Sequence, residues 1–264
     1  MVLCALSGIF TLIWPEQVTQ TTKAFTDTVF GAIGGVFLIS VSLFLVLCIW
    51  LAFSRHGKIR LGPADGRPEF STISWLSMLF AAGMGTGLVV WGAAEPMYHL
   101  LKPPSGVAGS PEALRQAFVI TNYHWGIHAW AIYGIGALVL AYFSFVKGGV
   151  YLASTPIRLG FKGNWTRWVG SMADLLAIFS VTFGVAGSIA MGTLQVESGL
   201  NDFMGTTLDS NSTQIAVLFV LFAAYMASAS TGIAKGIRIL SNLNIAFAVL
   251  VIIVIFEIIY KFKA

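Results

Sequence analysis

The stretch Ala81–Gly87, with the sequence AAGMGTG, lies near the middle of a long apolar run that we place at Ile73–Met97. A helix of this length can cross the roughly 30 Å hydrocarbon core of a bilayer. Glycine costs about 1 kcal/mol relative to alanine inside a helix, so three glycines at alternate positions favour a break at membrane depth. Backbone without helical hydrogen bonds is tolerated there only where it is buried in protein or lines a cavity. We therefore predict that Gly83–Gly87 is non-helical or kinked, with its carbonyl oxygens facing the protein interior.

Two interpretations of these glycines remain open. Gly83 and Gly87 form a GxxxG pair, the pattern that lets two membrane helices pack closely. Alternatively, the freed carbonyl groups and the half-helix ends of a broken helix bind ions and substrates, as in transporters with discontinuous helices. A dinucleotide-binding loop is excluded, because no strand precedes the motif.

The composition of the chain places it in a membrane. Of its 264 residues 57% are hydrophobic and only 10% are charged, and the mean hydropathy is +0.83. Soluble domains carry about 25% charged residues, so a soluble enzyme, a nucleic-acid-binding protein and a disordered chain are excluded. The N-terminal run Val2–Trp14 is too short to span, and is either a re-entrant segment or part of a longer helix. We predict an all-α polytopic membrane protein with six spans, at Val29–Phe53, Ile73–Met97, Ala117–Val146, Val169–Leu200, Gln214–Ala229 and Leu240–Tyr260.

The lysines and arginines in the loops predict the orientation. Ten of the 15 fall on one side of the spans and five on the other, and the side with more basic residues faces the cytoplasm. We therefore expect a multi-pass protein of the plasma (inner) membrane in which the loops Pro15–Thr26, Lys102–Pro111 and Asn201–Thr213 and the C-terminal end lie outside. The ten residues on the cytoplasmic side are Arg55, Lys58, Arg60, Arg67, Lys147, Arg158, Lys162, Arg167, Lys235 and Arg238.

Aromatic residues in the third predicted span suggest a cation site. On a continuous helix Trp125, Trp130 and Tyr133 fall within an arc of about 140°. Several π faces on one side of a helix can hold a quaternary ammonium group, which has no proton to donate. An interfacial aromatic belt or plain core packing is the alternative.

Two histidines in the same span also have a spacing that metal sites use. His124 and His128 stand four residues apart, but the sequence suggests no third ligand nearby. Hydrogen bonding within the bundle is therefore the expected role of both histidines.

Four acidic residues, Glu95, Asp174, Glu197 and Glu257, lie near or in the predicted spans. Glu95 and Glu197 stand near span ends, where we expect them to be solvated. Asp174 lies about one turn inside its span, where a carboxylate either caps a helix or belongs to a gate. We expect the structural role for Asp174.

Taken together, these motifs resemble the betaine/carnitine/choline transporter family. The resemblance covers nearly the whole chain, and the glycine stretch with its flanks is its most specific part. It rests on Trp75–Gly87, Trp91-Gly92, Glu95-Pro96, His124-Trp125, His128, Trp130-Ala131, Tyr133, Asp174–Ile178, Phe183-Gly184, Gly192, Leu194-Gln195 and Lys235–Asn242.

The resemblance implies a partial LeuT-type fold. Family members have two peripheral helices followed by two inverted five-helix repeats. The whole chain, 1–264, is then a single membrane domain with peripheral helices at 1–53, the first of them truncated, and the first five-helix repeat at 71–262. The second repeat is absent from this sequence. We therefore expect the chain alone to insert into a membrane but not to transport.

The resemblance also implies site residues. Trp125, Trp130 and Tyr133 would form half of an ammonium cage, and the Gly83–Gly87 stretch would line the same substrate site through Gly83, Met84, Gly85 and Gly87. The backbone carbonyls of Ala81 and Met84 would offer half of a sodium site. A second sodium site is in doubt, because two threonines expected in the family are Val181 and Val185 here. An acidic residue of proton-coupled choline members is Gly87 here, which disfavours proton coupling.

The function implied is secondary transport of trimethylammonium solutes (glycine betaine, carnitine or choline), coupled to sodium or by exchange. We expect that the protein is not an enzyme and that its partners are the solute and the lipid bilayer, not a nucleic acid. No cofactor is expected, apart from Na⁺ as a possible coupling ion. Homo-oligomers remain open. The alternatives are an inert truncated membrane remnant and a seven-helix receptor-like membrane protein; a retinal protein is disfavoured because Leu240–Tyr260 contains no lysine.

Overall fold

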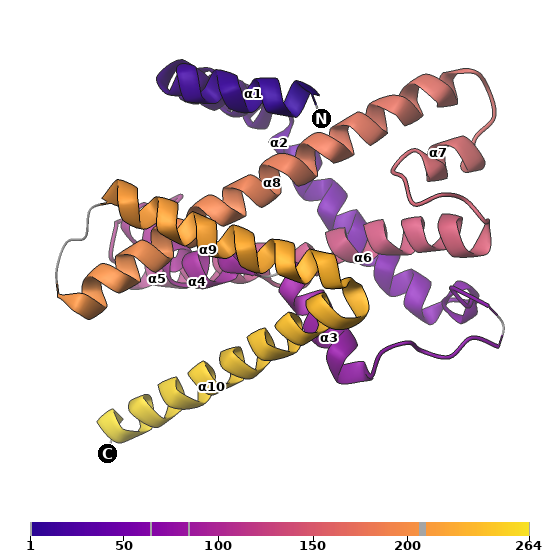
Figure 1. Ribbon diagram of the computed structural model, residues 1–264. Helices are drawn as coiled ribbons and strands as arrows, with labels where there is room; N and C mark the ends of the chain where they lie inside the picture. Colours follow the sequence, from indigo (N-terminus) through magenta and orange to yellow (C-terminus); the bar gives the residue numbers. More distant parts are fainter. Residues whose placement is uncertain (1, 64, 84, 206–209, 264) are drawn as a thin grey trace. The chain divides into compact units, whose positions relative to one another are not determined.

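All regular elements in the part of the chain that the structure describes are helices (Figure 1). The computed structural model describes residues 2–63, 65–83, 85–205 and 210–263. The predicted all-α fold is therefore confirmed. In chain order the elements are α1 (Val2–Ile13), α2 (Pro15–Phe53), η1 (Arg55–Lys58), α3 (Thr72–Gly83), α4 (Thr86–Leu101), α5 (Pro111–Trp125), α6 (Ile127–Ala141), η2 (Tyr142–Val146), α7 (Thr155–Gly160), α8 (Trp165–Met204), α9 (Ser210–Thr231), η3 (Ile233–Ile237) and α10 (Arg238–Lys263).

Five helical segments are long and apolar enough to cross a membrane, which makes the chain a multi-pass membrane protein. The remaining predicted span, Ile73–Met97, is divided between α3 and α4. The five segments are Pro15–Phe53, Pro111–Val146, Trp165–Met204, Ser210–Thr231 and Lys235–Lys261.

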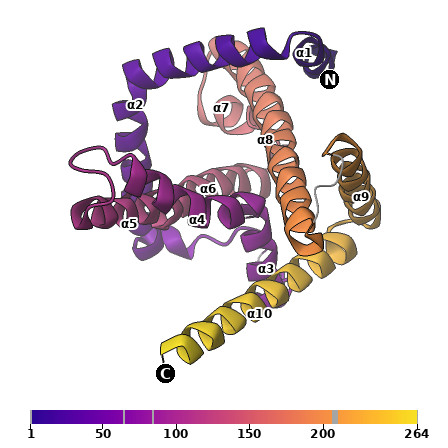
Figure 2. The same cartoon turned by 90° about the vertical axis from the view of Figure 1, so that its left-hand side faces the viewer.

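The start of α2 differs from the prediction. The polar stretch Pro15–Thr26, expected as a loop, is helical and belongs to the 39-residue helix α2. Proline at the first helical position favours this start, and the residues up to Thr26 include no further proline or glycine to end the helix. Figure 2 shows α2 changing direction along its length, and Gly31, Gly34 and Gly35 lie in its central part.

The predicted break in the glycine stretch is confirmed. Helix α3 ends at Gly83 and α4 begins at Thr86. Between them Gly85 has a ψ of −126°, far from the helical value of about −42°. Met84 lies outside the described residues.

A second break, at Gly126, was not predicted. The sequence predicts one helix through Ala117–Val146, but α5 ends at Trp125 and α6 begins at Ile127. Gly126 has φ −84° and ψ −150°. A Cβ atom at this position would collide with the carbonyl oxygen of Asn122, so the local backbone fits only glycine.

The chain forms two compact units, which we describe separately. Unit 1 consists of Met1–Asp65 and Ile120–Val185, and unit 2 of Gly66–Val119 and Ala186–Ala264. In unit 1, α2 packs along α6 through small residues. Ala131 is only 4% exposed, and the Cys48 thiol lies 3.8 Å from its carbonyl oxygen. Gly134 of α6 also lies beside Cys48, because a Cβ built there would be in ordinary van der Waals contact with Cys48 Sγ, at 3.7 Å.

The short helix α7 is held within unit 1 by Asp174 of α8. The carboxylate of Asp174 accepts a 2.8 Å hydrogen bond from the backbone N–H of Ser154, the residue just before α7. Its other oxygen lies 3.8 Å from the guanidinium of Arg158. The structural role expected for Asp174 is therefore confirmed.

In unit 2, α10 packs along α3, and a polar seam lies between the two helices. The buried hydroxyl-bearing residues Ser74, Ser77 and Ser241 come from both helices. Elsewhere in unit 2, Glu197 is 8% exposed and accepts a 2.7 Å hydrogen bond from the Gln214 amide, which joins α8 to α9. The expectation that Glu197 is solvated was wrong, because the Gln214 side chain of the next helix, α9, lies against the carboxylate.

Candidate functional site

The aromatic residues predicted to hold a cation lie in unit 1. Trp130 and Tyr133 stand three residues apart on α6, with ring centroids 6.3 Å apart and ring planes at 52°. Both rings are accessible, with exposed fractions of 37% and 54%. A cation binds an aromatic face when it lies within about 6 Å of the ring centroid, and two rings at this separation can contact the same methylated ammonium group.

Trp125 belongs to a different helix from this pair. It is the last residue of α5 and is half-buried. The predicted shared arc assumed one continuous helix, and the break at Gly126 removes that assumption. The helical spacing therefore supports the pair Trp130 and Tyr133, while the direction of Trp125 depends on the backbone at Gly126.

The two histidines of this region are also separated by the break. His124 lies on α5 and His128 on α6, so their four-residue spacing does not place them on one helix face. The ring of His128 instead packs against the ring of Tyr123 in a tilted arrangement, with centroids 4.2 Å apart and planes at 38°. This contact favours the packing role for His128 over the role of a metal ligand.

The predicted site residues of the glycine stretch lie in unit 2. Gly83 is the last residue of α3, Gly85 is non-helical, and Gly87 lies in the first turn of α4. The carbonyl group of Ala81 belongs to the last turn of α3, where a helix leaves its carbonyls without intrahelical donors. The break therefore supplies backbone oxygen at the depth where the prediction places a cation.

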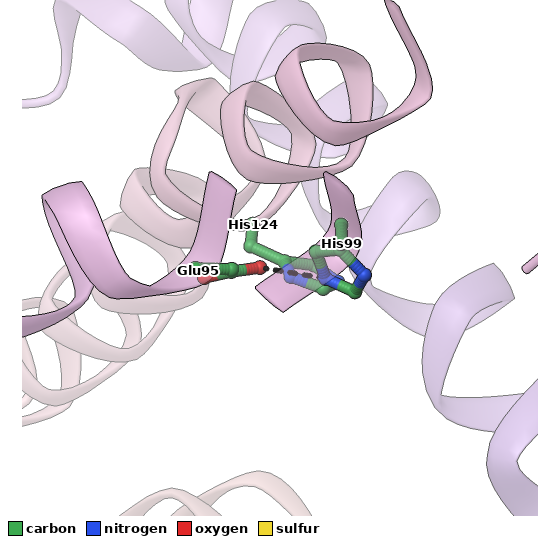
Figure 3. Close-up of side chains that lie close together, drawn as sticks. All are labelled: Glu95, His99 and His124. Carbon is green, nitrogen blue, oxygen red and sulfur yellow. Dashed lines mark ion pairs between the residues drawn. The ribbon is translucent and has the colours of Figure 1, made fainter. Parts of the chain in front are cut away.

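Glu95 and His99 form an ion pair on α4 that sequence reasoning missed. Their side chains meet one helical turn apart at 3.5 Å (Figure 3). Glu95 is only 8% exposed, so the expectation that it is solvated was wrong. The reason is that α4 continues through Pro96 to Leu101 instead of ending there. The i, i+4 spacing of the carboxylate and the imidazole could have predicted this pair from the sequence.

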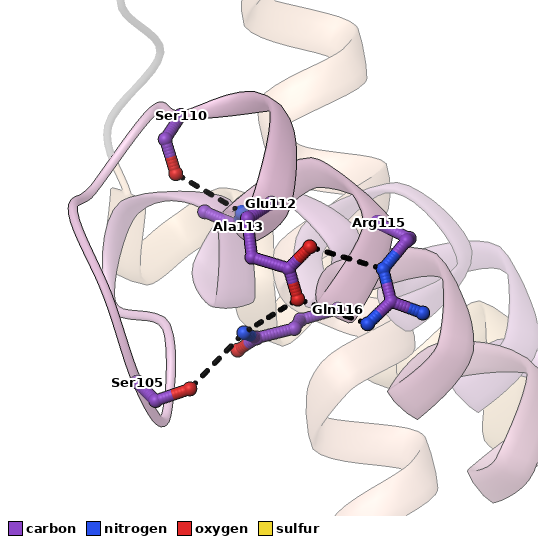
Figure 4. A network of polar contacts seen from close by, with 6 residues as sticks. All are labelled: Ser105, Ser110, Glu112, Ala113, Arg115 and Gln116. Atoms are coloured by element: carbon purple, nitrogen blue, oxygen red, sulfur yellow. Dashed lines mark hydrogen bonds and ion pairs between the residues drawn. The ribbon is translucent and has the colours of Figure 1, made fainter.

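A polar network fixes the start of α5, the helix that ends at Trp125 (Figure 4). Ser110 accepts a 3.1 Å hydrogen bond from the backbone N–H of Ala113, which is an N-cap. Glu112 accepts two hydrogen bonds from Arg115, of 2.9 and 3.1 Å. Gln116 donates to Glu112 and to Ser105 of the preceding loop.

Several membrane proteins with known solutes are similar to this chain. The glycine betaine transporter OpuD of Bacillus subtilis is 42% identical over 236 residues, which cover 88% of the chain and 45% of that protein. The betaine/ectoine transporter LcoP of Corynebacterium glutamicum is 38% identical over 210 residues, 79% of the chain and 33% of that protein. A glycine betaine/proline/choline/ectoine transporter of Vibrio parahaemolyticus is 37% identical over 262 residues, 96% of the chain and 46% of that protein.

The fold defines a helical, multi-pass membrane protein. The family model of the betaine/carnitine/choline family transporters matches residues 1–259. The chain belongs to this family. It spans about half the length, or less, of the curated relatives named above.

Proposed function

We propose that the protein is a secondary transporter of trimethylammonium solutes, of the glycine betaine, carnitine or choline type. The observation that carries this proposal is the accessible pair Trp130 and Tyr133 on α6. A trimethylammonium group has no N–H to donate, so aromatic faces are the protein groups that attract it most specifically. The relatives are named for betaine and choline, which belong to this class, and also for proline and ectoine, which carry no trimethylammonium group.

The proposal gives each site residue a role. Trp125, Trp130 and Tyr133 form half of the ammonium cage. The Gly83–Gly87 stretch lines the substrate site through Gly83, Met84, Gly85 and Gly87, and the carbonyl groups of Ala81 and Met84 bind a sodium ion. The non-helical backbone at Gly85 supports the second role, because broken membrane helices present carbonyl oxygens to ions.

Two coupling mechanisms remain within the proposal. Sodium bound at the α3–α4 break would couple solute entry to the sodium gradient. Val181 and Val185 on α8 lack the oxygen atoms that a second sodium site requires, which favours a single sodium ion or solute exchange. Na⁺ is a transported ion in the first mechanism and takes no part in solute exchange, and neither mechanism uses an organic cofactor.

The proposed architecture is a single membrane domain with a LeuT-type repeat at 71–262. Transport by alternating access needs one repeat to move against a second one around a shared site. We therefore propose that transport requires the full-length reading frame that contains the chain, and that the 264-residue chain alone inserts without transporting. Cross-linking in the membrane tests whether copies of the protein associate as homo-oligomers.

The test is uptake of labelled solutes by cells that lack their own quaternary-ammonium transport. Cells that express the full-length reading frame are expected to accumulate at least one of glycine betaine, carnitine and choline, and ectoine and proline complete the panel. Comparison of sodium-containing and sodium-free buffer, with and without preloaded solute, separates sodium coupling from exchange. Absence of uptake of every quaternary amine would refute the proposal and favour an inert remnant or a receptor.

A matched pair of variants tests the aromatic site. Trp130→Ala removes one face of the cage, worth about 2 kcal/mol when desolvated, so the KM is expected to rise about 30-fold. Trp168→Ala is the control, because Trp168 is 78% exposed on α8 and has no role in the cage. Equal KM values for the two variants would exclude Trp130 from the site.

A further inference from the structure

We propose that Gly126 is a positioning residue for the cation site: its backbone sets the direction of Trp125 relative to the pair Trp130 and Tyr133. This inference rests on the proposed function, because it assigns the cage residues a common ligand. It concerns a residue that contacts no solute itself and acts through its two neighbouring helices.

The break changes the chain direction at a single bond. The Gly126 N–H still donates a 2.9 Å hydrogen bond to the Asn122 carbonyl, so the helical turn of α5 is complete up to this residue. The ψ of Gly126 is −150°, about 108° from the helical value of −42°. The rotation therefore falls between Trp125, on α5, and the first residue of α6.

The backbone at this position fits only glycine. A Cβ atom on Gly126 would collide with the backbone carbonyl of Asn122, and a carbonyl cannot rotate away as a flexible side chain can. Gly85, Gly134 and Gly136 are not constrained in this way. A Cβ on Gly85 would lie at an ordinary 3.5 Å from the Ala81 carbonyl oxygen, and one on Gly136 would meet no atom within 4 Å.

An aromatic contact holds the two helices in this arrangement. Tyr123, in the last turn of α5, packs against His128, in the first turn of α6, at a centroid distance of 4.2 Å. The rings bridge the break from one side. Packing across the break therefore stabilises the same backbone geometry that the missing side chain of Gly126 permits.

The consequence for the cage is geometric. A methylammonium group gains from two or three rings only when their faces point at one position within about 6 Å of each ring. Trp130 and Tyr133 are fixed to each other by α6, whereas Trp125 reaches the same position only through the angle at Gly126. A residue that forces a different angle moves Trp125 away, and the affinity for the cation falls.

The experiment compares Gly126→Ala with Gly136→Ala in the full-length reading frame, by uptake of the solute that the wild type transports best. Both variants add one methyl group to a glycine of the same span. Gly126→Ala is expected to raise the KM about tenfold or more, since small misplacements of binding groups have effects of this size. Gly136→Ala is expected to leave the KM within about twofold of the wild type, because open space surrounds that position.

The separate values of KM and Vmax distinguish a positioning role from misfolding. Loss of folded protein lowers Vmax in proportion to the amount in the membrane, and the remaining molecules keep the wild-type KM. If Gly126→Ala lowers only Vmax, or leaves both values unchanged, Gly126 does not position the site. Inhibition of uptake by tetramethylammonium, which carries the cation without a carboxylate, is expected to weaken by the same factor as the KM rises.

A second variant keeps the inference testable if Gly126→Ala does not reach the membrane. Tyr123→Leu removes the ring that packs across the break and adds no atom at Gly126. It is expected to raise the KM about three- to tenfold. An unchanged KM for Tyr123→Leu contradicts the inference. Failure of the proposed function is distinguishable from failure of this inference, because the wild type itself would then show no uptake of any quaternary amine.

Discussion

The side-chain amide of Asn242 donates a 3.2 Å hydrogen bond to the hydroxyl oxygen of Ser74, and this bond joins α10 to α3. Ser74 also accepts a hydrogen bond from Ser71, the residue just before α3. The amide oxygen of Asn242 is buried and has no hydrogen-bond partner among the described residues. The polar pair thus connects the first half of the broken span to the last helix at the point where both helices begin.

The first prediction concerns the strength of this pair. Ser74→Ala and Asn242→Ala, alone and combined, are expected to give a coupling energy of about 0.6 kcal/mol, the average for hydrogen bonds between membrane helices. The measurement is the free energy of unfolding in mixed micelles titrated with sodium dodecyl sulfate. Asn244→Ala is the matched control, because Asn244 is an exposed asparagine on the same helix. A coupling energy near zero would mean that the two side chains do not interact in the folded protein.

The second prediction concerns the attachment of α7. Asp174→Ala leaves the N–H of the almost fully buried Ser154 without its acceptor, at a cost of about 1–3 kcal/mol. Asp174→Asn keeps an oxygen acceptor and loses only the charge near Arg158, and a partly exposed ion pair is worth about 0–1 kcal/mol. Hydrogen exchange of the amides in Thr155–Gly160 is therefore expected to rise strongly for Asp174→Ala and weakly for Asp174→Asn.

Asp27→Ala is the control for these variants, since Asp27 is an exposed aspartate of the same unit. It is expected to leave exchange in α7 unchanged. Equal protection of α7 in Asp174→Ala and the wild type would contradict the assigned role of Asp174. Faster exchange in all three variants would instead indicate that the whole unit is destabilised.

The two helix breaks differ in how far the sequence could predict them. Three glycines within Gly83–Gly87 exceed what a helix interior tolerates, so composition alone indicates the first break. The second break depends on Gly126, a single glycine, and single glycines also occur in continuous membrane helices, as at Gly134 and Gly136 of α6. What distinguishes Gly126 is its close approach to the carbonyl of Asn122, which is a feature of the folded structure and not of the local sequence.

The burial of the Glu95 and Glu197 carboxylates could also not be predicted from the sequence. Glu95 stands next to Pro96, and proline is the usual sign that a helix ends, but α4 accommodates it and extends to Leu101. The partner of Glu197, Gln214, is 17 residues away on the next helix, so no local spacing indicates the pair. Hydropathy located the spans because it is a local property; the polar contacts between helices are not.

The third prediction concerns the start of α5. Ser110→Ala removes the side-chain acceptor of the Ala113 N–H, and loss of an N-cap costs about 1 kcal/mol. The expected result is a lower free energy of unfolding and faster hydrogen exchange in the first turn of α5. Ser105→Ala is the comparison, because the Ser105 hydroxyl accepts a hydrogen bond from the exposed side chain of Gln116 and not from a backbone N–H of the described residues. It is expected to change the stability by less than about 0.5 kcal/mol. If the two serine variants are equally stable, the cap does not contribute.

The last prediction concerns the orientation of the chain in the membrane. The ten-to-five bias of lysines and arginines predicts that the loop that contains Arg55, Lys58 and Arg60 lies in the cytoplasm. The five crossings between that loop and Tyr260 are an odd number, so Tyr260 is expected to lie outside.

Fusions of alkaline phosphatase and of green fluorescent protein report the side of the membrane. Alkaline phosphatase is active only outside, and green fluorescent protein fluoresces only inside. After Lys58 the fluorescent fusion is expected to be bright and the phosphatase inactive, and after Tyr260 the reverse. Replacement of the three basic residues by alanine is expected to weaken the difference between the two sites, because it removes three of the ten charges that set the orientation. Active phosphatase after Lys58 together with fluorescence after Tyr260 would establish the opposite topology.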